Sequence, residues 1–164
     1  MIIDAYIGAE TDKKLVILGN IDKENGYYQK VLGKYSSHPR FKNVVFPGAI
    51  YDKSMLLSLR KECYAYIHGH SVGGTNPGLL EAMAVTDLNF LYGCVFNKEV
   101  GQDNALYFDN ASELAVLLDK SIDVDLIRKL GTGAKKRMRE AYRWEDVASA
   151  YCDIFHAGVS GNGN

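Results

Sequence analysis

Residues 64–84 read YAYIHGHSVGGTNPGLLEAMA and contain, in order, a strand, a Gly-rich loop and the first turns of a helix. The apolar residues before His68 predict the strand, while Asn76 and Pro77 are typical of the N-cap and the first position of a helix. The intervening glycines let the backbone turn sharply and leave its N–H groups uncovered. A loop that ends in this way at a helix start suits an anion, most often a phosphate. We therefore expect the functional centre here; the alternative, that the glycines only join strand to helix, stays open.

Two side chains beside this loop are candidate ligand contacts. Glu81 lies one turn after Pro77 on the same helix face, where its carboxylate suits the hydroxyl groups of a ligand; the alternative is a surface carboxylate. His70 is a candidate donor to a phosphate or a sugar hydroxyl, and His68 is expected in the core. The two histidines have the H-x-H spacing of metal ligands, but no third ligand is evident, so no metal site is expected.

The loop differs from the common nucleotide-binding motifs. Gly69 and Gly74 have the spacing of a P-loop, but Thr75 stands where that motif has its lysine. The sequence contains no G-x-G-x-x-G, which leaves a nicotinamide cofactor without support. No cofactor is expected.

Short apolar runs alternate with helical periodicity along the rest of the chain. We expect strands at 15–19, 44–46, 64–68, 89–92 and 105–108, and helices at 1–10, 26–37, 52–62, 77–85, 112–118, 123–142 and 144–155. Residues 94–104 are expected to be a loop, Ser112 to cap the helix after it, and Gly131 and Gly133 to interrupt the long basic helix. This alternation predicts an α/β fold, a Rossmann-like parallel sheet with helices on both faces.

Ligands of such sheets bind beyond the carboxyl ends of the strands, and a second loop is expected at that edge. It follows the strand at 44–46 and begins with Pro47 and Gly48. Ile50 and Tyr51, which come next, are candidates for flanking a nucleobase.

Bulk composition excludes several classes of protein. The 164 residues suit one domain, or one half of a two-lobed protein. A net charge of −1 gives no sign of a nucleic-acid partner. The three cysteines lack metal spacing and indicate a reduced, cytoplasmic protein, and no apolar run is long enough to cross a membrane. The basic helix is expected to be a solvated face, with peripheral contact to anionic lipid at the inner face of the membrane as the alternative.

Four stretches of the sequence resemble the C-terminal, donor-binding half of GT-B glycosyltransferases of the large retaining family 4. The run HGHSVGGTNP followed by LLEAMA is similar to a rhamnosyltransferase-like subgroup of surface polysaccharide synthesis. The other stretches are KLVILGN at 14–20, VFPGAIYD at 45–52 and YRWEDV at 142–147. The resemblance covers residues 1–157, and a disordered tail is expected at 158–164.

The resemblance implies roles for particular residues. Glu81 matches the second glutamate of the family's pair, which binds the ribose of the nucleotide. Gly74, Thr75 and Asn76 match the loop that meets the diphosphate and the sugar. Gly48 and Ile50 match the backbone that reads the base. Gly73 stands where the family's first glutamate contacts the donor sugar, so that carboxylate contact is absent and an unusual or deoxy sugar is favoured.

The resemblance also implies that parts of the family's architecture lie outside this sequence. The first strand of the domain, its basic diphosphate loop and the N-terminal acceptor domain, which carries the catalytic side chains, have no counterpart here. The catalytic residues are therefore unknown, and the chain alone is expected to bind nucleotide weakly and to turn over nothing.

The expected function is that of a donor-binding domain. Its parent would transfer a hexose such as rhamnose from a UDP- or dTDP-linked donor to a surface polysaccharide, such as a capsule, or to a lipid-linked acceptor, without a metal. Two alternatives stay open. One is a sugar-nucleotide epimerase lobe of the same fold, and the other is a non-catalytic nucleotide-binding or receiver-like α/β module.

Overall fold

The computed structural model describes residues 1–20, 24 and 26–160, with only the backbone for 157–160. The strands are β1 (Leu15–Leu18), β2 (Val44–Gly48), β3 (Tyr66–His68), β4 (Asn89–Tyr92) and β5 (Leu106–Phe108). The helices are α1 (Ile2–Gly8), α2 (Gly26–Tyr35), α3 (Lys53–Glu62), α4 (Pro77–Met83), α5 (Val95–Gly101), α6 (Ala111–Asp119), α7 (Val124–Ala141) and α8 (Trp144–Ser160), with short 3-10 turns η1 (Pro39–Asn43) and η2 (Gln102–Asn104). Every predicted strand is present.

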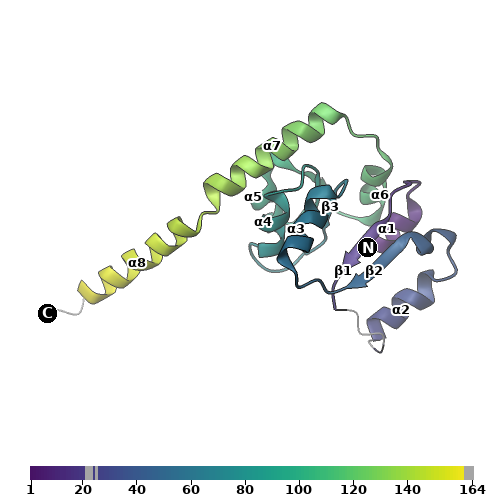
Figure 1. The fold of residues 1–164 in the computed structure, drawn as a ribbon, viewed down its shortest axis with the longest axis horizontal. Helices are drawn as coiled ribbons and strands as arrows, with labels where there is room; N and C mark the ends of the chain where they lie inside the picture. The colour runs from purple at the N-terminus through teal and green to yellow at the C-terminus, as the bar shows by residue number, and fades with distance from the viewer. Residues whose placement is uncertain (21–23, 25, 161–164) are drawn as a thin grey trace.

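The strands are parallel but form two hydrogen-bonded sheets, where a single sheet was expected. β1 pairs with β2, and Val16 stands opposite Val45. β3, β4 and β5 form the second sheet, in that order. In Figure 1 the two sheets belong to one body, with β1 and β2 on the side that also holds α2. The sheets are therefore joined by packing of side chains and not by a continuous ladder.

Helices cover both faces of the larger sheet. Neighbouring residues of a strand point to opposite faces, and the neighbours Phe90 and Leu91 belong to different buried clusters. Phe90 packs with Ala5 of α1 and Leu114 of α6. Leu91 packs with helices α4, α5 and α7. Both side chains have no exposed surface, and each such burial contributes roughly 2 kcal/mol.

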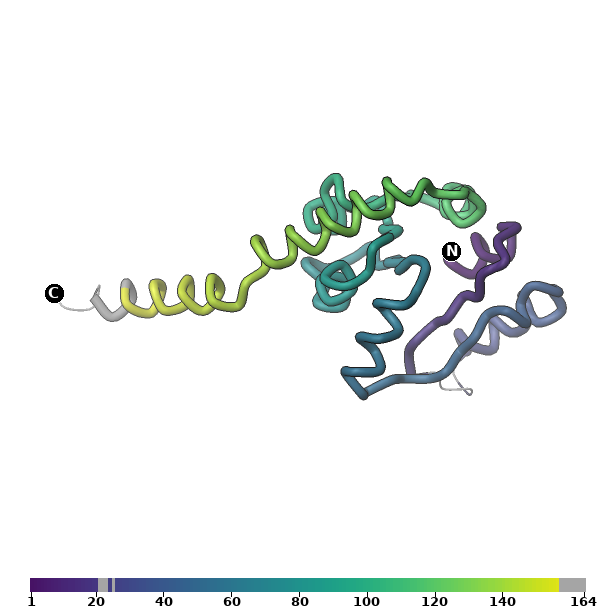
Figure 2. Tube along the Cα trace, turned by 45° about the horizontal axis from the view of Figure 1, so that its top comes forward, coloured from purple at the N-terminus to yellow at the C-terminus, as the bar shows by residue number. Residues whose placement is uncertain are grey.

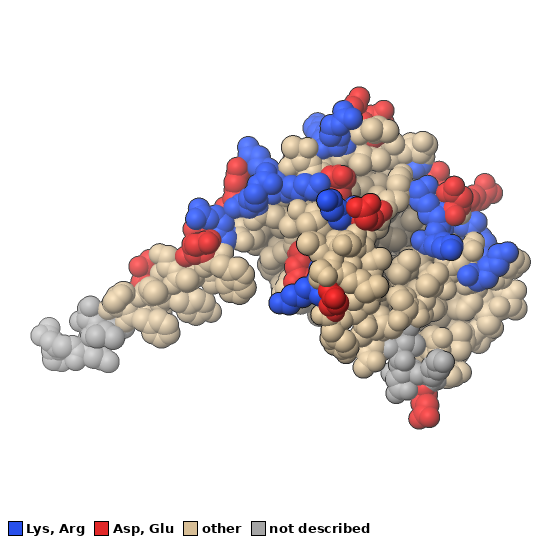
Figure 3. Space-filling model, viewed as in Figure 1, with Lys and Arg blue, Asp and Glu red and all other residues tan. Residues whose placement is uncertain are grey.

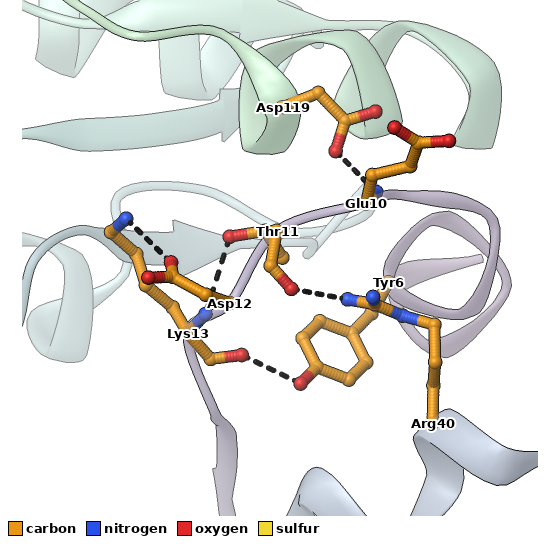
Figure 4. A network of polar contacts seen from close by, with 7 residues as sticks. All are labelled: Tyr6, Glu10, Thr11, Asp12, Lys13, Arg40 and Asp119. Carbon is orange, nitrogen blue, oxygen red and sulfur yellow. Dashed lines mark hydrogen bonds and ion pairs between the residues drawn. The ribbon is translucent and has the colours of Figure 1, made fainter.

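The connection from α1 to β1 is held by a polar network, shown in Figure 4. The hydroxyl of Tyr6 donates to the carbonyl of Lys13 (2.6 Å), and Arg40 donates to the carbonyl of Thr11 (2.6 Å). Asp119 of α6 accepts a hydrogen bond from the backbone N–H of Glu10. The network joins the start of β1 to η1 on one side and to α6 on the other.

A second polar cluster joins α1 to α2. Asp4 accepts hydrogen bonds from Lys34 and from Tyr35. These donors, Lys34 first, hold the pKa of Asp4 well below its usual range. The same contact raises the pKa of Lys34. Helix α1 is thus tied to its neighbours on the solvent side as well as through the core.

The prediction of a loop at 94–104 is wrong, because this segment contains α5 and η2. The helix is short and Cys94 makes no side-chain cap, so local signals are weak. It is fixed instead by burial of Asn97 and Val100.

The expected cap of α6 at Ser112 is also wrong. Asn110 is the cap, because its side chain accepts the N–H of Glu113 (3.0 Å). The Glu113 carboxylate in turn accepts the N–H of Asp109 (2.7 Å). The arrangement resembles a capping box, except that the carboxylate accepts the N–H of the residue before the cap. Helix α3 is capped in the same way, because the side chain of Asp52 accepts the N–H groups of Ser54 and Met55.

Helix α7 is continuous, so the predicted interruption at Gly131 and Gly133 is wrong. A Cβ at Gly131 would lie 2.3 Å from the Asp87 carboxylate and 2.7 Å from its Cα. A Cβ at Gly133 would meet the side chain of Asn104 at 1.9 Å. Both glycines therefore permit close approach of α7 to the body, and neither ends the helix.

Helix α8 extends away from the body, as Figures 1 and 2 show. It runs to Ser160, beyond the predicted end at 155, so the first three residues of the predicted tail are helical; residues 161–164 lie outside the described residues. Its apolar side chains are uncovered: Trp144 is 83% exposed and Phe155 68%. Figure 3 shows Lys and Arg gathered along α7 and largely absent from α8. No helix in the described part of the chain combines the length and the apolar character needed to span a membrane.

Candidate functional site

The Gly-rich loop follows β3 and ends at α4, as the sequence predicts. The side chain of Asn76 accepts the N–H groups of Gly78 (2.9 Å) and Leu79 (3.3 Å), so Asn76 is the N-cap. Residues 70–75 are exposed. The start of α4 is thus fixed, and the loop before it is open to solvent.

Gly73 has a φ of +109°, a conformation that residues with a Cβ rarely adopt. The loop conformation therefore accounts for glycine at the position where the resembling family has a glutamate. A carboxylate at this position would require a different backbone.

Glu81 is held by a residue that the sequence analysis did not single out. Its carboxylate accepts a hydrogen bond from Arg60 Nη1 at 2.7 Å. The Arg60 side chain is only 15% exposed, whereas that of Glu81 is 61% exposed. A Cβ at Gly78 would lie 3.8 Å from Arg60 Nη2, so the guanidinium sits beside the start of α4. Arg60 therefore fixes the carboxylate on the solvent side of α4, where a ligand can reach it.

No local signal in the sequence could have identified Arg60. It lies 21 residues before Glu81, on α3, among other charged residues of that helix. Its carbonyl also accepts the hydroxyl of the buried Thr86 (2.7 Å), which anchors this end of α3.

His68 and His70 lie side by side. Their rings stack with centroids 4.8 Å apart, and the Tyr66 hydroxyl lies 3.2 Å from His68 Nδ1. Among the described residues no group of three His, Cys, Asp or Glu side chains is placed to hold a metal ion. His68 is buried, as predicted for a core residue, and its Nε2 has no hydrogen-bond partner. Burial, and to a smaller extent His70, lowers the pKa of His68 to about 4.

The low pKa of His68 predicts acid sensitivity of the fold. Between pH 6.5 and about 4 the unfolded chain binds a proton that the folded chain rejects, so stability falls as pH falls through this window. When the pH is lowered from 7 to 4.5, we expect the free energy of unfolding to fall by about 2 kcal/mol less in the His68→Gln variant than in the unaltered chain. Urea unfolding at both pH values measures this, with His38→Gln, at an exposed histidine, as the control. Equal losses in all three proteins would contradict the assignment.

Asn97 anchors the Gly-rich loop from α5. Its side-chain amide donates to the carbonyl of His70 and to that of Tyr92, both at 2.9 Å. Asn97 is only 3% exposed. Because residues 94–104 were predicted to be a loop, this contact could not be foreseen.

The predicted base-binding residues come from the other sheet. Gly48 ends β2 with a φ of +92°, and its carbonyl accepts the N–H of Gly19 (3.2 Å). Ile50 is half-buried and Tyr51 is 86% exposed. Within the described part of the chain, no hydrogen bond, ion pair or ring contact joins these three residues to the Gly-rich loop. The structure brings Glu81, Asn76 and Arg60 together, and no contact described in the structure joins the predicted base-binding segment to them.

The molecule also has shallow hollows elsewhere. One, of about 270 Å³, lies between η2 and α7 and is lined in part by Asn104, Lys136 and Arg137. A second, of about 280 Å³, lies beside it against Lys98 and Tyr107. None of the predicted site residues lines either hollow.

Two solved structures show the fold class independently. The crystal structure of Anabaena Alr3699/HepE in complex with UDP matches 95% of this chain and 44% of that chain, with a TM-score of 0.81 and 15% identity. Sucrose-phosphate synthase (tll1590) from Thermosynechococcus elongatus matches 98% of this chain and 42% of that chain, with a TM-score of 0.80 and 17% identity. No family model and no curated protein matches the sequence. The predicted Rossmann-like α/β fold of the GT-B type is confirmed, and the chain spans less than half the length of either structure.

Proposed function

We propose that this chain is the nucleotide-sugar donor-binding domain of a glycosyltransferase. The observation that carries the proposal is the arrangement at the end of β3. An exposed Gly-rich loop ends at the Asn76 cap, and the Arg60–Glu81 pair lies beside it. The likeness to a structure solved with UDP supports a nucleotide as the ligand.

Each part of the site has a role in this proposal. The backbone N–H groups of Gly74 and Thr75 bind the diphosphate and stabilise its charge as it leaves the sugar. Glu81, oriented by Arg60, accepts hydrogen bonds from the ribose hydroxyls. His70 donates to the phosphate or to a sugar hydroxyl, and the segment from Gly48 to Tyr51 flanks the base.

The parent protein, in this proposal, transfers a hexose such as rhamnose from a UDP- or dTDP-linked donor. Its acceptor is a polysaccharide or a lipid-linked sugar, bound by a further domain that also carries the catalytic side chains. Metal and cofactor play no part. The three free cysteines suit a cytoplasmic location.

Isothermal titration calorimetry of the chain with UDP, dTDP and GDP tests the proposal. We expect the two pyrimidine diphosphates to bind with a Kd of about 1 mM, because only part of the site is present, and GDP to bind more weakly. If UDP binds no more tightly than GDP, the proposed preference for a pyrimidine base is wrong. Absence of binding by all three would contradict the donor site.

A further inference from the structure

Helix α8 is exposed along the whole length over which its side chains are described. Every residue of 144–156 is exposed, whereas α7 before it buries four residues against the body. Figures 1 and 2 show α8 extending away from the body, so its sides are accessible. Most helices in proteins owe their stability to the packing of an apolar face, and isolated helices are marginal in water. Helix α8, which has 17 residues, is therefore stabilised by any surface that covers its apolar side chains.

The apolar side chains of α8 form one continuous stripe. They follow one another at intervals of three, four and three residues, which is the a and d spacing of a coiled coil. The stripe consists of Trp144, Val147, Tyr151 and Ile154, with Phe155 beside them. The exposed fraction of Tyr151 is 61% and that of Ile154 is 67%. A contiguous apolar surface of this kind marks an interaction site.

The acidic residues of α8 lie on the opposite face of the helix. At 3.6 residues per turn, Glu145, Asp146 and Asp153 point away from the stripe. Two stripes can therefore pack together without burying a carboxylate. The helix contains no Lys or Arg, so its polar face does not suit an anionic membrane, which attracts helices with a basic polar face.

The stripe is large enough to hold two copies of the chain together. An aromatic side chain buries roughly 150–250 Å², so the three on the stripe, at their exposed fractions, contribute roughly 450 Å² per copy. With the two aliphatic side chains included, a pair of copies would bury roughly 1,200 Å², which is the lower end of the range for specific interfaces. A stripe that is apolar throughout is also complementary to itself, as an interface between two identical subunits requires.

We propose that the apolar stripe of α8 is a docking surface for α8 of a second copy of this chain. The two helices pack stripe against stripe, with their acidic faces in solvent. The dimer is weak, with a Kd of about 50 µM, because the interface is small and association costs rotational and translational freedom. The Gly-rich loop and Glu81 lie on the body and take no part, so the proposal holds whether or not the chain binds a nucleotide.

Sedimentation velocity of the unaltered chain tests the proposal, at protein concentrations from about 5 to 500 µM, tenfold on either side of the expected Kd. Trp144 is the only tryptophan of the chain, so its fluorescence reports on the stripe itself. We expect the mass to rise from one copy to two across this range. We expect the emission of Trp144 to move to shorter wavelength over the same concentrations.

Two variants of the stripe and one control separate this interface from other causes of association. Ile154→Asp places a charge on the stripe and is expected to weaken the dimer at least about tenfold. Ser149→Asp adds the same charge to the opposite face of α8 and is expected to change the Kd by less than about threefold. A double variant, Tyr151→Ala with Ile154→Ala, removes apolar surface while favouring the helix, and it is expected to weaken the dimer as Ile154→Asp does.

Three results would overturn the docking surface. One is a chain that stays monomeric at every concentration, or a dimer that persists in both stripe variants. Another is short-wavelength emission at every concentration without a rise in mass, which would place α8 on the body of its own chain. The third is a monomeric chain whose Trp144 emission shifts only when vesicles of phosphatidylglycerol and phosphatidylcholine are added, which would make a membrane the occupant.

Discussion

Replacing Glu81 with alanine is expected to weaken UDP binding by about tenfold to a hundredfold, the usual effect of losing a charge-assisted hydrogen bond. The carboxylate is 61% exposed, so a ligand reaches it without rearrangement of the protein. Its removal also leaves the guanidinium of Arg60, which is only 15% exposed, without this partner. A UDP titration followed through backbone amide shifts in NMR measures the change: with a starting Kd of about 1 mM, the variant should show no saturation at millimolar UDP.

The matched control for this prediction is Glu62→Ala, which removes an exposed carboxylate at the end of α3 close in sequence to Arg60. It alters net charge by the same amount. We expect Glu62→Ala to leave the Kd within about twofold, because exposed charges that do not contact the ligand contribute little. Equal effects of the two substitutions would show a general effect of charge and would contradict a ribose contact at Glu81.

Replacing Gly131 with alanine is expected to destabilise the fold by about 2 kcal/mol, although alanine is the better helix former. The new Cβ would lie 2.7 Å from the Cα of Asp87, and backbone cannot turn aside as a flexible side chain can. Helix α7 must then move off the core, where Leu130 and Ala134 are buried. Thermal unfolding should show a Tm lower by about 6 °C.

Gly33→Ala is the control, because Gly33 lies in α2 and a Cβ there meets no atom within 4 Å. That substitution is expected to stabilise by about 0.5–1 kcal/mol through helix propensity alone. If Gly131→Ala is as stable as Gly33→Ala, α7 does not lie as close to Asp87 as described.

The sequence predicts the strands well because each is a short apolar run. Phe90 and Leu91 are both fully buried on opposite faces, so β4 needs apolar residues in succession. The start of α4 is also determined by neighbouring residues, since the Asn76 side chain accepts N–H groups only two and three residues away. Position and type of these elements therefore follow from neighbouring residues.

The parts that could not be predicted depend on distant contacts. Helix α5 is held by burial of Val100 and Asn97. The continuity of α7 depends on what Gly131 touches in the body. Arg60 reaches Glu81 only after α3 and α4 have packed. Likewise, apolar runs identify strands but carry no information on which edges pair, so the division into two sheets appears only in the structure.

The central claim is that a nucleoside diphosphate binds at the loop after β3. The most direct test is a titration of the isotope-labelled chain with UDP, followed through the backbone amide signals in NMR. The account predicts that the amides of 73–76 and of Glu81 shift with one common Kd. Shifts confined to the hollow between η2 and α7, around Asn104 and Lys136, would place the nucleotide elsewhere and contradict it.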